Sequence, residues 1–269
     1  MTKKKILLIL PVVMMIVLVM LMITILKGCT GRSVHEPEII ENISVDYSEL
    51  VRNGDRFIYE DENYDGCFGI DVSTFQGDID WKKVSEDGVE FVFIRIGRRG
   101  ATTGLIYEDD EFEQNYRDAK ENGIRIGVYF FSQAISPEEA KEEAGWVVKQ
   151  LKGKQIDLPV VYDLEEVYLE DETPRTDGLT GEMATENALA FLETIEKSHY
   201  EGMLYTSLYW ADYFYDMDRL GAYPIWYAQY DSDVPELDRP ISIWQYSSQG
   251  IIDGIDEKTD LNIMFIRKD

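Results

Sequence analysis

Four carboxylates stand at points in the sequence where a folded chain could bring them together. Asp163 and Glu165 come at the end of an apolar run, and the alternation of side chains along a strand places them on one face. Asp71 comes at the end of an earlier apolar run, and Asp260 begins the last one. Because an unpaired buried carboxylate costs on the order of several kcal/mol, such groups normally need a partner or a catalytic role. A Mg²⁺ or Ca²⁺ site on the same oxygens is the alternative that these residues alone leave open.

The sequence around these acids alternates between short apolar runs and amphipathic stretches. Strands are predicted at 68–72, 91–96, 124–131, 158–164, 202–206, 225–229, 241–246 and 261–266, and helices at 81–84, 108–121, 137–151, 184–197 and 210–217. This alternation predicts an α/β fold with a parallel sheet, and about eight strands favour an irregular β/α (TIM-like) barrel whose last three strands lack full helices. An open doubly wound sheet is the alternative. In a barrel of this type the carboxyl ends of the strands face the active site, so Asp71, Asp163 and Glu165 would meet there. Asp260 begins its strand, which leaves its depth in the barrel open.

The N-terminus carries signals for export. Three lysines at positions 3–5 precede an apolar run over residues 6–26. At about 1.5 Å per residue this run spans roughly 31 Å, enough to cross a bilayer core of about 30 Å. The lysines should stay in the cytoplasm, so we expect a cell-membrane protein with a cytoplasmic tail at 1–5, one transmembrane anchor at 6–26, an extracellular acidic linker at 27–65 and the main folded domain at 66–269. A secreted form with a cleaved signal peptide and a lipoprotein attached at Cys29 are the rival interpretations.

Charge and composition limit the partners. The first 32 residues contain five basic and no acidic residues, so the net charge of −26 for the whole chain becomes −31 for the remainder. A surface of this sign repels phosphate backbones, which argues against nucleic acid as a partner. Cys29 and Cys67 lie on opposite sides of the expected linker, and His35 and His199 lie far apart, so we expect neither a disulfide framework nor a zinc site. We also expect no cofactor and a monomeric catalytic domain.

A series of motifs extends from Cys67 nearly to the end of the chain. They are Gly69-Ile70-Asp71-Val72-Ser73, Gln76-Gly77, Ile79-Asp80-Trp81, Phe91-Val92-Phe93-Ile94-Arg95, Gly127-Val128-Tyr129, Leu158-Pro159-Val160-Val161 with Asp163 and Glu165, Trp244-Gln245-Tyr246 and Asp260-Leu261-Asn262. In this order they resemble the glycoside hydrolase family 25 lysozymes. The resemblance implies an irregular β/α barrel that hydrolyses the β-1,4 bond between N-acetylmuramic acid and N-acetylglucosamine in peptidoglycan, for cell-wall remodelling.

Matched by motif, the resemblance implies that Glu165 is the general acid and that Asp71, Asp163 and Asp260 are the other active-site acids. Neighbouring carboxylates raise a pKa and so help to keep an acid protonated near neutral pH. Two routes stay open: a second carboxylate acts as nucleophile or base, or the 2-acetamido group of the substrate attacks while Asp163 orients it. The Asp-x-Glu spacing is similar to that of enzymes that use the second route, which we therefore favour.

Five further residues are candidates for binding the glycan. Tyr129, at a predicted strand end, could hydrogen-bond the acetamido group, and Trp226 and Trp244 could stack on sugar rings. Gln229 and Gln245 follow the same reasoning. Packing inside the barrel is the alternative role for each of them.

Two positions depart from the family pattern near the expected cleft. Phe130 stands where members often have histidine, and Gly97-Arg98-Arg99-Gly100 replaces a Gly-Tyr-Gly-like turn. Both put the glycan preference in doubt. The alternative from another functional class is a catalytically weak or silent module that binds wall glycans. Such a module could lose the acids, whereas all four are present here.

Overall fold

A computed structural model describes residues 40–268 of the chain. The expected tail at 1–5, the anchor at 6–26 and the first part of the linker, with Cys29 and His35, lie outside the described residues. Within residues 40–268, no helix is both long enough and apolar enough to cross a membrane.

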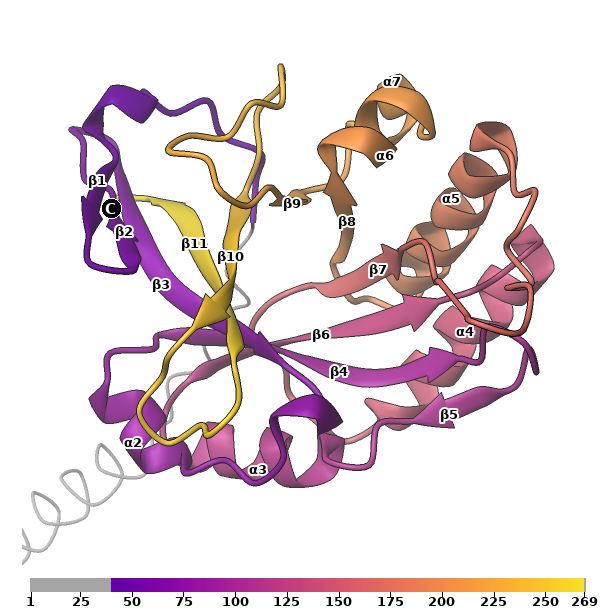
Figure 1. The fold of residues 1–269 in the computed structure, drawn as a ribbon, viewed down its shortest axis with the longest axis horizontal. Coiled ribbons are helices and arrows are strands. Elements are labelled where there is room, and N and C mark those ends of the chain that lie inside the picture. Colours follow the sequence, from indigo (N-terminus) through magenta and orange to yellow (C-terminus); the bar gives the residue numbers. More distant parts are fainter. Residues whose placement is uncertain (1–39, 269) are drawn as a thin grey trace, which may run out of the picture. The chain divides into compact units, whose positions relative to one another are not determined.

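Eight strands form a closed β-barrel (Figure 1). In pairing order they are β3 (Tyr64–Val72), β11 (Thr259–Arg267), β10 (Ile243–Gly250), β9 (Ile225–Ala228), β8 (Gly202–Ser207), β7 (Val160–Leu164), β6 (Arg125–Ser132) and β4 (Phe91–Arg99). Pairing of β3 with β4 closes the ring, and the short β5 (Ile106–Glu108) adds to β4 outside it. The predicted barrel is therefore confirmed, and the open doubly wound sheet is excluded.

The last strand runs against its neighbours. β11 pairs antiparallel with both β10 and β3, whereas the other neighbours within the ring are parallel. The expectation of a parallel sheet is therefore wrong for β11. Because this strand is reversed, its first residues, including Asp260, lie at the same end of the barrel as the carboxyl ends of the parallel strands. A parallel last strand would have placed Asp260 at the opposite end.

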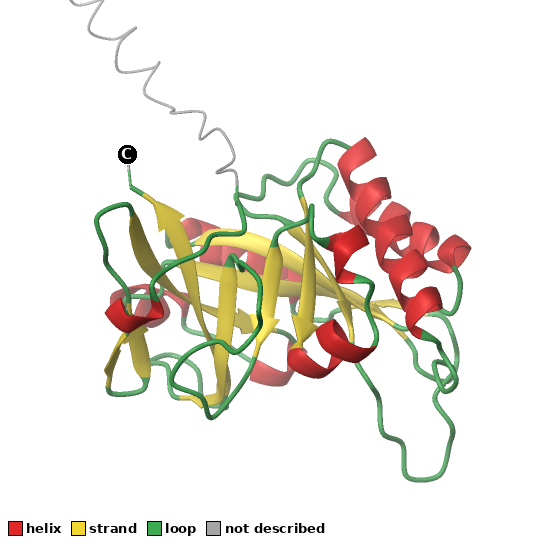
Figure 2. Cartoon of the chain, turned by 90° about the horizontal axis from the view of Figure 1, so that it is seen from above, coloured by secondary structure: helices red, strands yellow, loops and turns green. Residues whose placement is uncertain are grey.

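Helices lie outside the barrel (Figure 2). They are the 3₁₀ helix η2 (Thr74–Gln76) and α2 (Trp81–Glu86), α3 (Phe112–Glu121), α4 (Pro137–Gln150), α5 (Gly181–Lys197), α6 (Leu208–Tyr213) and α7 (Met217–Leu220). The first residue of α4 is the predicted one, because Ser136 Oγ accepts a hydrogen bond from the backbone N–H of Glu139 and proline fits the first turn. Residues 229–258 contain no helix, in agreement with the expected lack of full helices late in the chain.

Alternation along the strands separates two cores. Outward-facing residues pack against the helices. The inward-facing set fills the barrel and includes Phe91, Phe93, Val161, Met203, Ile243 and Met264. A Cβ on Gly127 would lie 2.2 Å from the Phe93 ring, so only glycine lets this ring cross the barrel. The interior is thus a packed core and not a channel.

Part of the expected linker is instead built into the floor of the barrel. Ile40 is buried among the inward-facing side chains. Asn42 Oδ1 accepts a hydrogen bond from the backbone N–H of Ile225 at 2.7 Å, and its Nδ2 donates to the carbonyl of Tyr223 at 2.8 Å. These contacts lie at the start of β9, at the end of the barrel opposite Asp260.

The segment that follows also packs on the barrel. It contains η1 (Tyr47–Glu49) and a hairpin of β1 (Val51–Asn53) and β2 (Arg56–Ile58). The Phe57 ring lies 4.9 Å from the Trp244 ring between centroids. The lack of sustained periodicity suggested a spacer, but Ile43, Phe57 and Tyr59 are buried in the outer core, whereas Val51 and Ile58 are exposed. Within the described residues, 40–65 thus belong to the same compact unit as the barrel.

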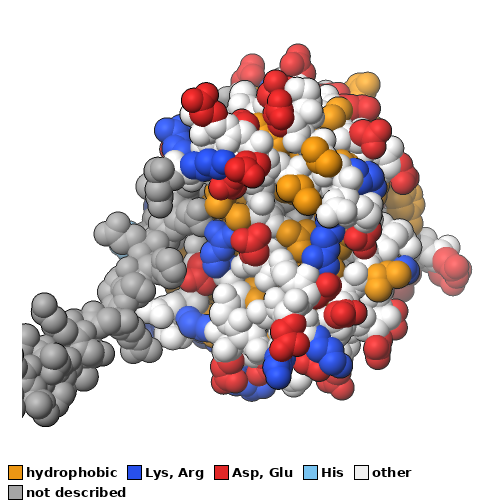
Figure 3. All heavy atoms as spheres, turned by 90° about the vertical axis from the view of Figure 1, so that its left-hand side faces the viewer, with side chains coloured by type: hydrophobic (Ala, Val, Ile, Leu, Met, Phe, Trp, Pro, Cys, Tyr) orange, Lys and Arg blue, Asp and Glu red, His pale blue; other side chains and the backbone are white. Residues whose placement is uncertain are grey.

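Acidic side chains dominate the charged surface. On the face shown in Figure 3, Asp and Glu are spread among fewer Lys and Arg. This distribution agrees with the net charge of −26. Most of these acids are exposed and solvated, so the acids that matter chemically are those few that are buried.

Candidate active site

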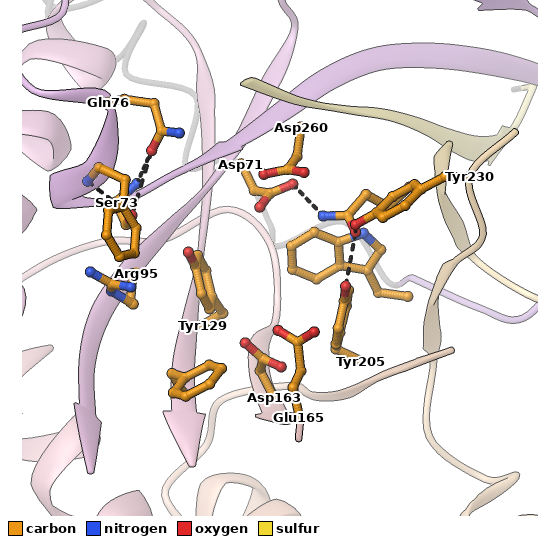
Figure 4. A pocket seen from close by; sticks show the side chains of 14 residues that line it. Asp71, Ser73, Gln76, Arg95, Tyr129, Asp163, Glu165, Tyr205, Tyr230 and Asp260 are labelled. Atoms are coloured by element: carbon orange, nitrogen blue, oxygen red, sulfur yellow. Dashed lines mark hydrogen bonds between the residues drawn. The ribbon is translucent and has the colours of Figure 1, made fainter. Parts of the chain in front are cut away.

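A cavity of about 270 Å³ lies at the end of the barrel where the parallel strands finish (Figure 4). It is lined by Asp71, Ser73, Phe75, Gln76, Arg95, Tyr129, Phe131, Asp163, Glu165, Tyr205, Trp226, Tyr230, Gln245 and Asp260. All four predicted acids are therefore brought together, and three of the five predicted binding residues join them. The location follows the general rule for barrels, whose sites lie at the carboxyl ends of the strands.

Asp71 is buried and held by two amides. Its Oδ2 accepts hydrogen bonds from Gln245 Nε2 and from Asn262 Nδ2, each at 2.8 Å. Burial raises the pKa of Asp71 to about 6, and the two hydrogen bonds oppose that rise. Asp71 is therefore mainly a carboxylate at neutral pH, in spite of its burial.

The orientation of the Gln245 amide is determined by two tyrosines. Tyr205 and Tyr230 donate their hydroxyl hydrogens to Gln245 Oε1, at 2.9 and 2.7 Å. Because Oε1 accepts both bonds, the NH₂ group is the end that faces Asp71. Sequence reasoning missed both tyrosines, although alternation along 202–206 would have placed Tyr205 on the same face as Met203.

Asn262 is oriented in the same way. Trp226 Nε1 donates to Asn262 Oδ1 at 2.8 Å, which leaves the Asn262 NH₂ group to bond Asp71. The indole of Trp226 is only 2% exposed, because the Phe93 ring stacks on it at 4.7 Å and the edges of Tyr129 and Tyr205 cover other parts. Trp226 thus forms a wall of the cavity and offers little free ring face to a sugar.

Asp163 and Glu165 lie side by side at the end of β7 (Figure 4). Burial first, and then the charge of Glu165, raise the pKa of Asp163 well above its usual range. Burial and the charge of Asp71 raise the pKa of Glu165 to about 7. The pair therefore retains a proton near neutral pH. Asp163 Oδ1 is buried and has no hydrogen-bond partner within residues 40–268, so it is available to a ligand.

The backbone at Glu165 is fixed by a buried glutamine. Gln133 Nε2 donates to the carbonyl of Glu165 at 3.1 Å, and Gln133 Oε1 accepts from Thr176 Oγ1 at 3.1 Å. One side chain thus connects β6, the end of β7 and the loop that follows. This contact positions the general-acid candidate, and sequence reasoning did not identify it.

Asp260 faces Asp71 across the β3–β11 ladder. Burial, followed by the charges of Asp71 and Glu165, raises the pKa of Asp260 to about 8. Tyr129 stands between the two pairs of acids, and burial together with the charge of Asp71 raises its pKa well above the usual value. Its hydroxyl therefore stays protonated and can act as a hydrogen-bond donor.

Two predicted binding residues do not line the cavity. Trp244 is fully buried in the outer core, where its Nε1 donates to the carbonyl of Gln229 at 3.0 Å. Gln229 Oε1 accepts from the Tyr227 hydroxyl at 2.8 Å and from the backbone N–H of Glu236. Both side chains lie on the outer side of their strands, because side chains alternate along β9 and β10.

Two residues at the rim were not predicted. Arg95 interrupts an apolar strand, and its Nε and Nη2 both lie 2.7 Å from Asp109 Oδ2. The Phe75 ring lies 5.1 Å from that guanidinium and is 74% exposed, which leaves a ring face open at the cavity edge. The charge of Arg95 gave a sequence signal, whereas nothing in the local pattern distinguished Phe75.

The positions that depart from the family pattern lie in different places. Phe130 points away from the cavity and packs against Trp146 and Phe191, so it does not shape the cleft. Arg99 is buried, and its Nε lies 2.6 Å from Glu143 Oε1. Arg98 is exposed and lines a second hollow beside the cavity. Within the described residues, no group of three His, Cys, Asp or Glu side chains is arranged to hold a metal ion.

Comparison with known proteins gives a consistent result. Residues 70–255 match the family described as glycosyl hydrolases family 25. The chain is 28% identical over 196 residues to the autolytic lysozyme of Clostridium acetobutylicum, covering 72% of this chain and 54% of that protein. It is 28% identical over 206 residues to lysozyme M1 of Streptomyces globisporus, covering 73% of this chain and 67% of that protein. The structure of a family 25 glycosyl hydrolase from Bacillus anthracis superposes with a TM-score of 0.62 at 25% identity. The superposition covers 79% of this chain and 94% of that structure. This chain thus spans about half the length of the clostridial protein.

Proposed function

Because the chain belongs to the glycosyl hydrolases family 25, we propose that it is a muramidase that cuts the β-1,4 bond from N-acetylmuramic acid to N-acetylglucosamine in peptidoglycan. The observation that supports this most directly is the cavity in which Asp71, Asp163, Glu165 and Asp260 meet. Their raised pKa values supply a protonated acid beside a carboxylate, which is what glycosidic cleavage requires.

Glu165 is the general acid in this proposal. Its proton passes to the glycosidic oxygen as the bond from that oxygen to C1 breaks. The carbonyl oxygen of the substrate's 2-acetamido group attacks C1 and forms a cyclic intermediate. Meanwhile the Asp163 carboxylate accepts a hydrogen bond from the acetamido N–H and stabilises the developing positive charge. Water then attacks C1 as the bond from C1 to the acetamido oxygen breaks, which regenerates the acetamido group. The water gives its proton to the Glu165 carboxylate, which restores the acid.

The substrate itself helps to place the proton. Asp163 is more deeply buried than Glu165, and burial together with neighbouring carboxylates raises the pKa of both. Asp163 Oδ1 has no hydrogen-bond partner among the described residues. An N–H donated by the acetamido group to this oxygen would favour the Asp163 carboxylate and leave the shared proton on Glu165. Binding of the correct sugar would thus produce the protonation state that the reaction needs.

The full chain, with and without Glu165→Gln, tests the proposal on purified peptidoglycan. New reducing ends at N-acetylmuramic acid, detected by mass spectrometry and absent with the variant, are the expected result. Glu166→Gln is the matched control, because Glu166 is the adjacent glutamate and is exposed. A folded wild-type protein that binds walls but releases no product would instead indicate a silent glycan-binding module.

The route can be tested separately. A substrate analogue without the N-acetyl carbonyl cannot form the cyclic intermediate. We expect its turnover to be lost, whereas undiminished turnover would show that a second carboxylate, and not the acetamido group, attacks C1.

We further propose that residues 6–26 anchor the enzyme in the bacterial cell membrane with the catalytic domain outside, for remodelling of the cell's own wall. The three lysines and the apolar run support this orientation. Protease added to intact wall-less cells should remove the domain. Release of the wild-type protein into the medium would point to a cleaved signal peptide.

A further inference from the structure

A second hollow adjoins the catalytic cavity. It has a volume of about 510 Å³ and lies between residues 98–107 on one side and Val167 and Leu169 on the other. Phe131 lines both the hollow and the cavity, so the two lie on either side of this side chain. None of the four acids lines the hollow. Two arginines and two threonines supply its polar groups, and the remaining lining is largely apolar or aromatic.

A β-bulge turns Arg98 toward this hollow. Arg95 pairs with Tyr129 across β4 and β6, but Arg98 pairs with Phe131, so three residues on β4 span two on β6. The extra residue reverses the alternation, and Arg98 shares the cleft face with Phe131 while Arg99 points outward to Glu143. Gly97, which precedes Arg98, faces outward. Only glycine fits at this position, because a Cβ there would lie 2.6 Å from the carbonyl oxygen of Tyr107.

The walls of the hollow are fixed by two other arginines. Arg99 Nη1 donates to the carbonyl of Gly104 at 2.6 Å, and the backbone N–H of Arg175 donates to the carbonyl of Ala101 at 2.7 Å. Arg175 also forms a two-point ion pair with Glu139, with both distances 2.7 Å. The turn and the loop after β7 are therefore held together before any ligand binds.

Arg98 is the cation that remains available. It is exposed, it has no carboxylate partner among the described residues, and its guanidinium carbon lies 5.0 Å from the centroid of the Tyr107 ring. In a chain with a net charge of −26, an unpaired guanidinium beside an acidic cavity selects for an anionic group on the ligand. Guanidinium groups bind carboxylates with two parallel hydrogen bonds.

We propose that this hollow, defined by Arg98, Thr103, Tyr107 and Leu169, binds the peptide stem of the glycan strand through a stem carboxylate. The inference rests on the proposed function. Arg98, Phe131 and Asp163 lie in one row across β4, β6 and β7, so Arg98 stands two strand spacings, about 10 Å, from Asp163. A stem carried by the muramic acid that Asp163 contacts can span that distance with its first residues. Arg98 is thus a determinant of specificity for stem-bearing strands and takes no part in the chemistry.

The experiment compares the full chain with Arg98→Met on two synthetic glycan substrates, one with peptide stems and one without. Neither substrate carries a phosphate-containing wall polymer. Arg98→Met keeps an unbranched side chain at this position and removes the charge. Arg267→Met is the matched control, because Arg267 also lies over a tyrosine ring, that of Tyr64 at 5.8 Å, at the other end of the barrel.

Arg98→Met should lower kcat/KM about tenfold on stem-bearing strands, mainly through KM, and leave stem-free strands unchanged. Amidation of the stem carboxylates should reduce wild-type activity to the level of the variant, and Arg98→Lys should recover part of the loss. An equal loss on both substrates, or no loss on either, would overturn the inference while leaving the muramidase proposal in place. Failure of the wild type to cut even stem-free strands would overturn both. Cell walls that carry phosphate polymers serve as a third substrate. A loss confined to that substrate would assign Arg98 to a phosphate and refute the stem site.

Discussion

Asp260 lies directly opposite Asp71 in the antiparallel ladder between β11 and β3. Side chains in such positions are close neighbours, and two like charges there repel each other. The amides of Gln245 and Asn262 both bond Asp71, so the ladder partner Asp260 is the one that retains its proton to higher pH. The reversed last strand therefore creates a second pair of unequal acids, facing the pair on β7.

The first prediction concerns the general acid. Glu165→Gln should lower kcat by about 100-fold or more, because loss of a positioned acid commonly removes a factor of about 10²–10⁴. The folded structure should persist, since glutamine is nearly isosteric. Release of reducing ends and the thermal unfolding midpoint check the two parts of the prediction. Activity close to that of Glu166→Gln would assign the acid role to another residue.

The second prediction is a shift in the pH profile. The acid must be protonated, so kcat/KM should fall as pH rises through the pKa of Glu165, about 7. The charge of Asp71 contributes to that raised pKa. Asp71→Asn removes the charge and should move the falling limb to lower pH, whatever activity remains. A limb that stays in place, or moves to higher pH, would show that Asp71 does not act on Glu165 in this way.

The third prediction is a decline of stability with pH. The pKa of Asp260 is raised to about 8 and that of Asp71 to about 6, both above unfolded values near 4. The folded protein therefore binds more protons than the unfolded chain over this interval, and the free energy of unfolding must fall as pH rises from 5 to 8. Urea unfolding at four pH values measures the slope. Asp260→Asn should flatten it, and an unchanged slope would contradict the assignment.

The fourth prediction compares two glutamines. Gln245→Ala removes a donor from Asp71 and leaves the hydroxyls of Tyr205 and Tyr230 without their shared acceptor, so activity should fall by about tenfold or more. Gln229→Ala lies outside the cavity and should leave kcat/KM within about twofold. Steady-state measurement of kcat/KM on peptidoglycan for both variants tests this prediction. Equal losses would mean that the outer side of β9 also controls the chemistry.

The fifth prediction tests the domain boundary. A chain that begins at Pro37 should be more stable than one that begins at Gly66, by on the order of several kcal/mol, because the shorter chain loses the buried Ile40 and Phe57. Urea unfolding of the two truncated chains provides the comparison. Equal midpoints would show that residues 37–65 only rest on the barrel surface.

Sequence reasoning predicted the barrel and the four acids for identifiable reasons. Alternation alone places Asp163 and Glu165 on one face, and the carboxyl-end rule brings Asp71 to the same rim. Alternation could not tell Trp226 from Trp244, because both strands are apolar on both faces. One residue of register decides which tryptophan faces the cavity, and that register depends on contacts between strands.

The features that were missed depend on long-range contacts. The direction of β11 is not encoded in the residues Leu261–Ile266, which would suit either orientation. The bulge at Gly97 depends on the approach of Tyr107 and Trp146. Residues 40–65 carry no periodic pattern, so their packing is visible only when the barrel that receives them is present.

The place of Ile40 in the barrel floor has a mechanical consequence. The chain enters the folded domain at the end opposite the cleft, between the starts of β8, β9 and β10. A force applied at Ile40 would therefore act on the floor, at the end of the barrel opposite the acids. With the proposed membrane anchor, attachment and catalysis would use opposite ends of one barrel.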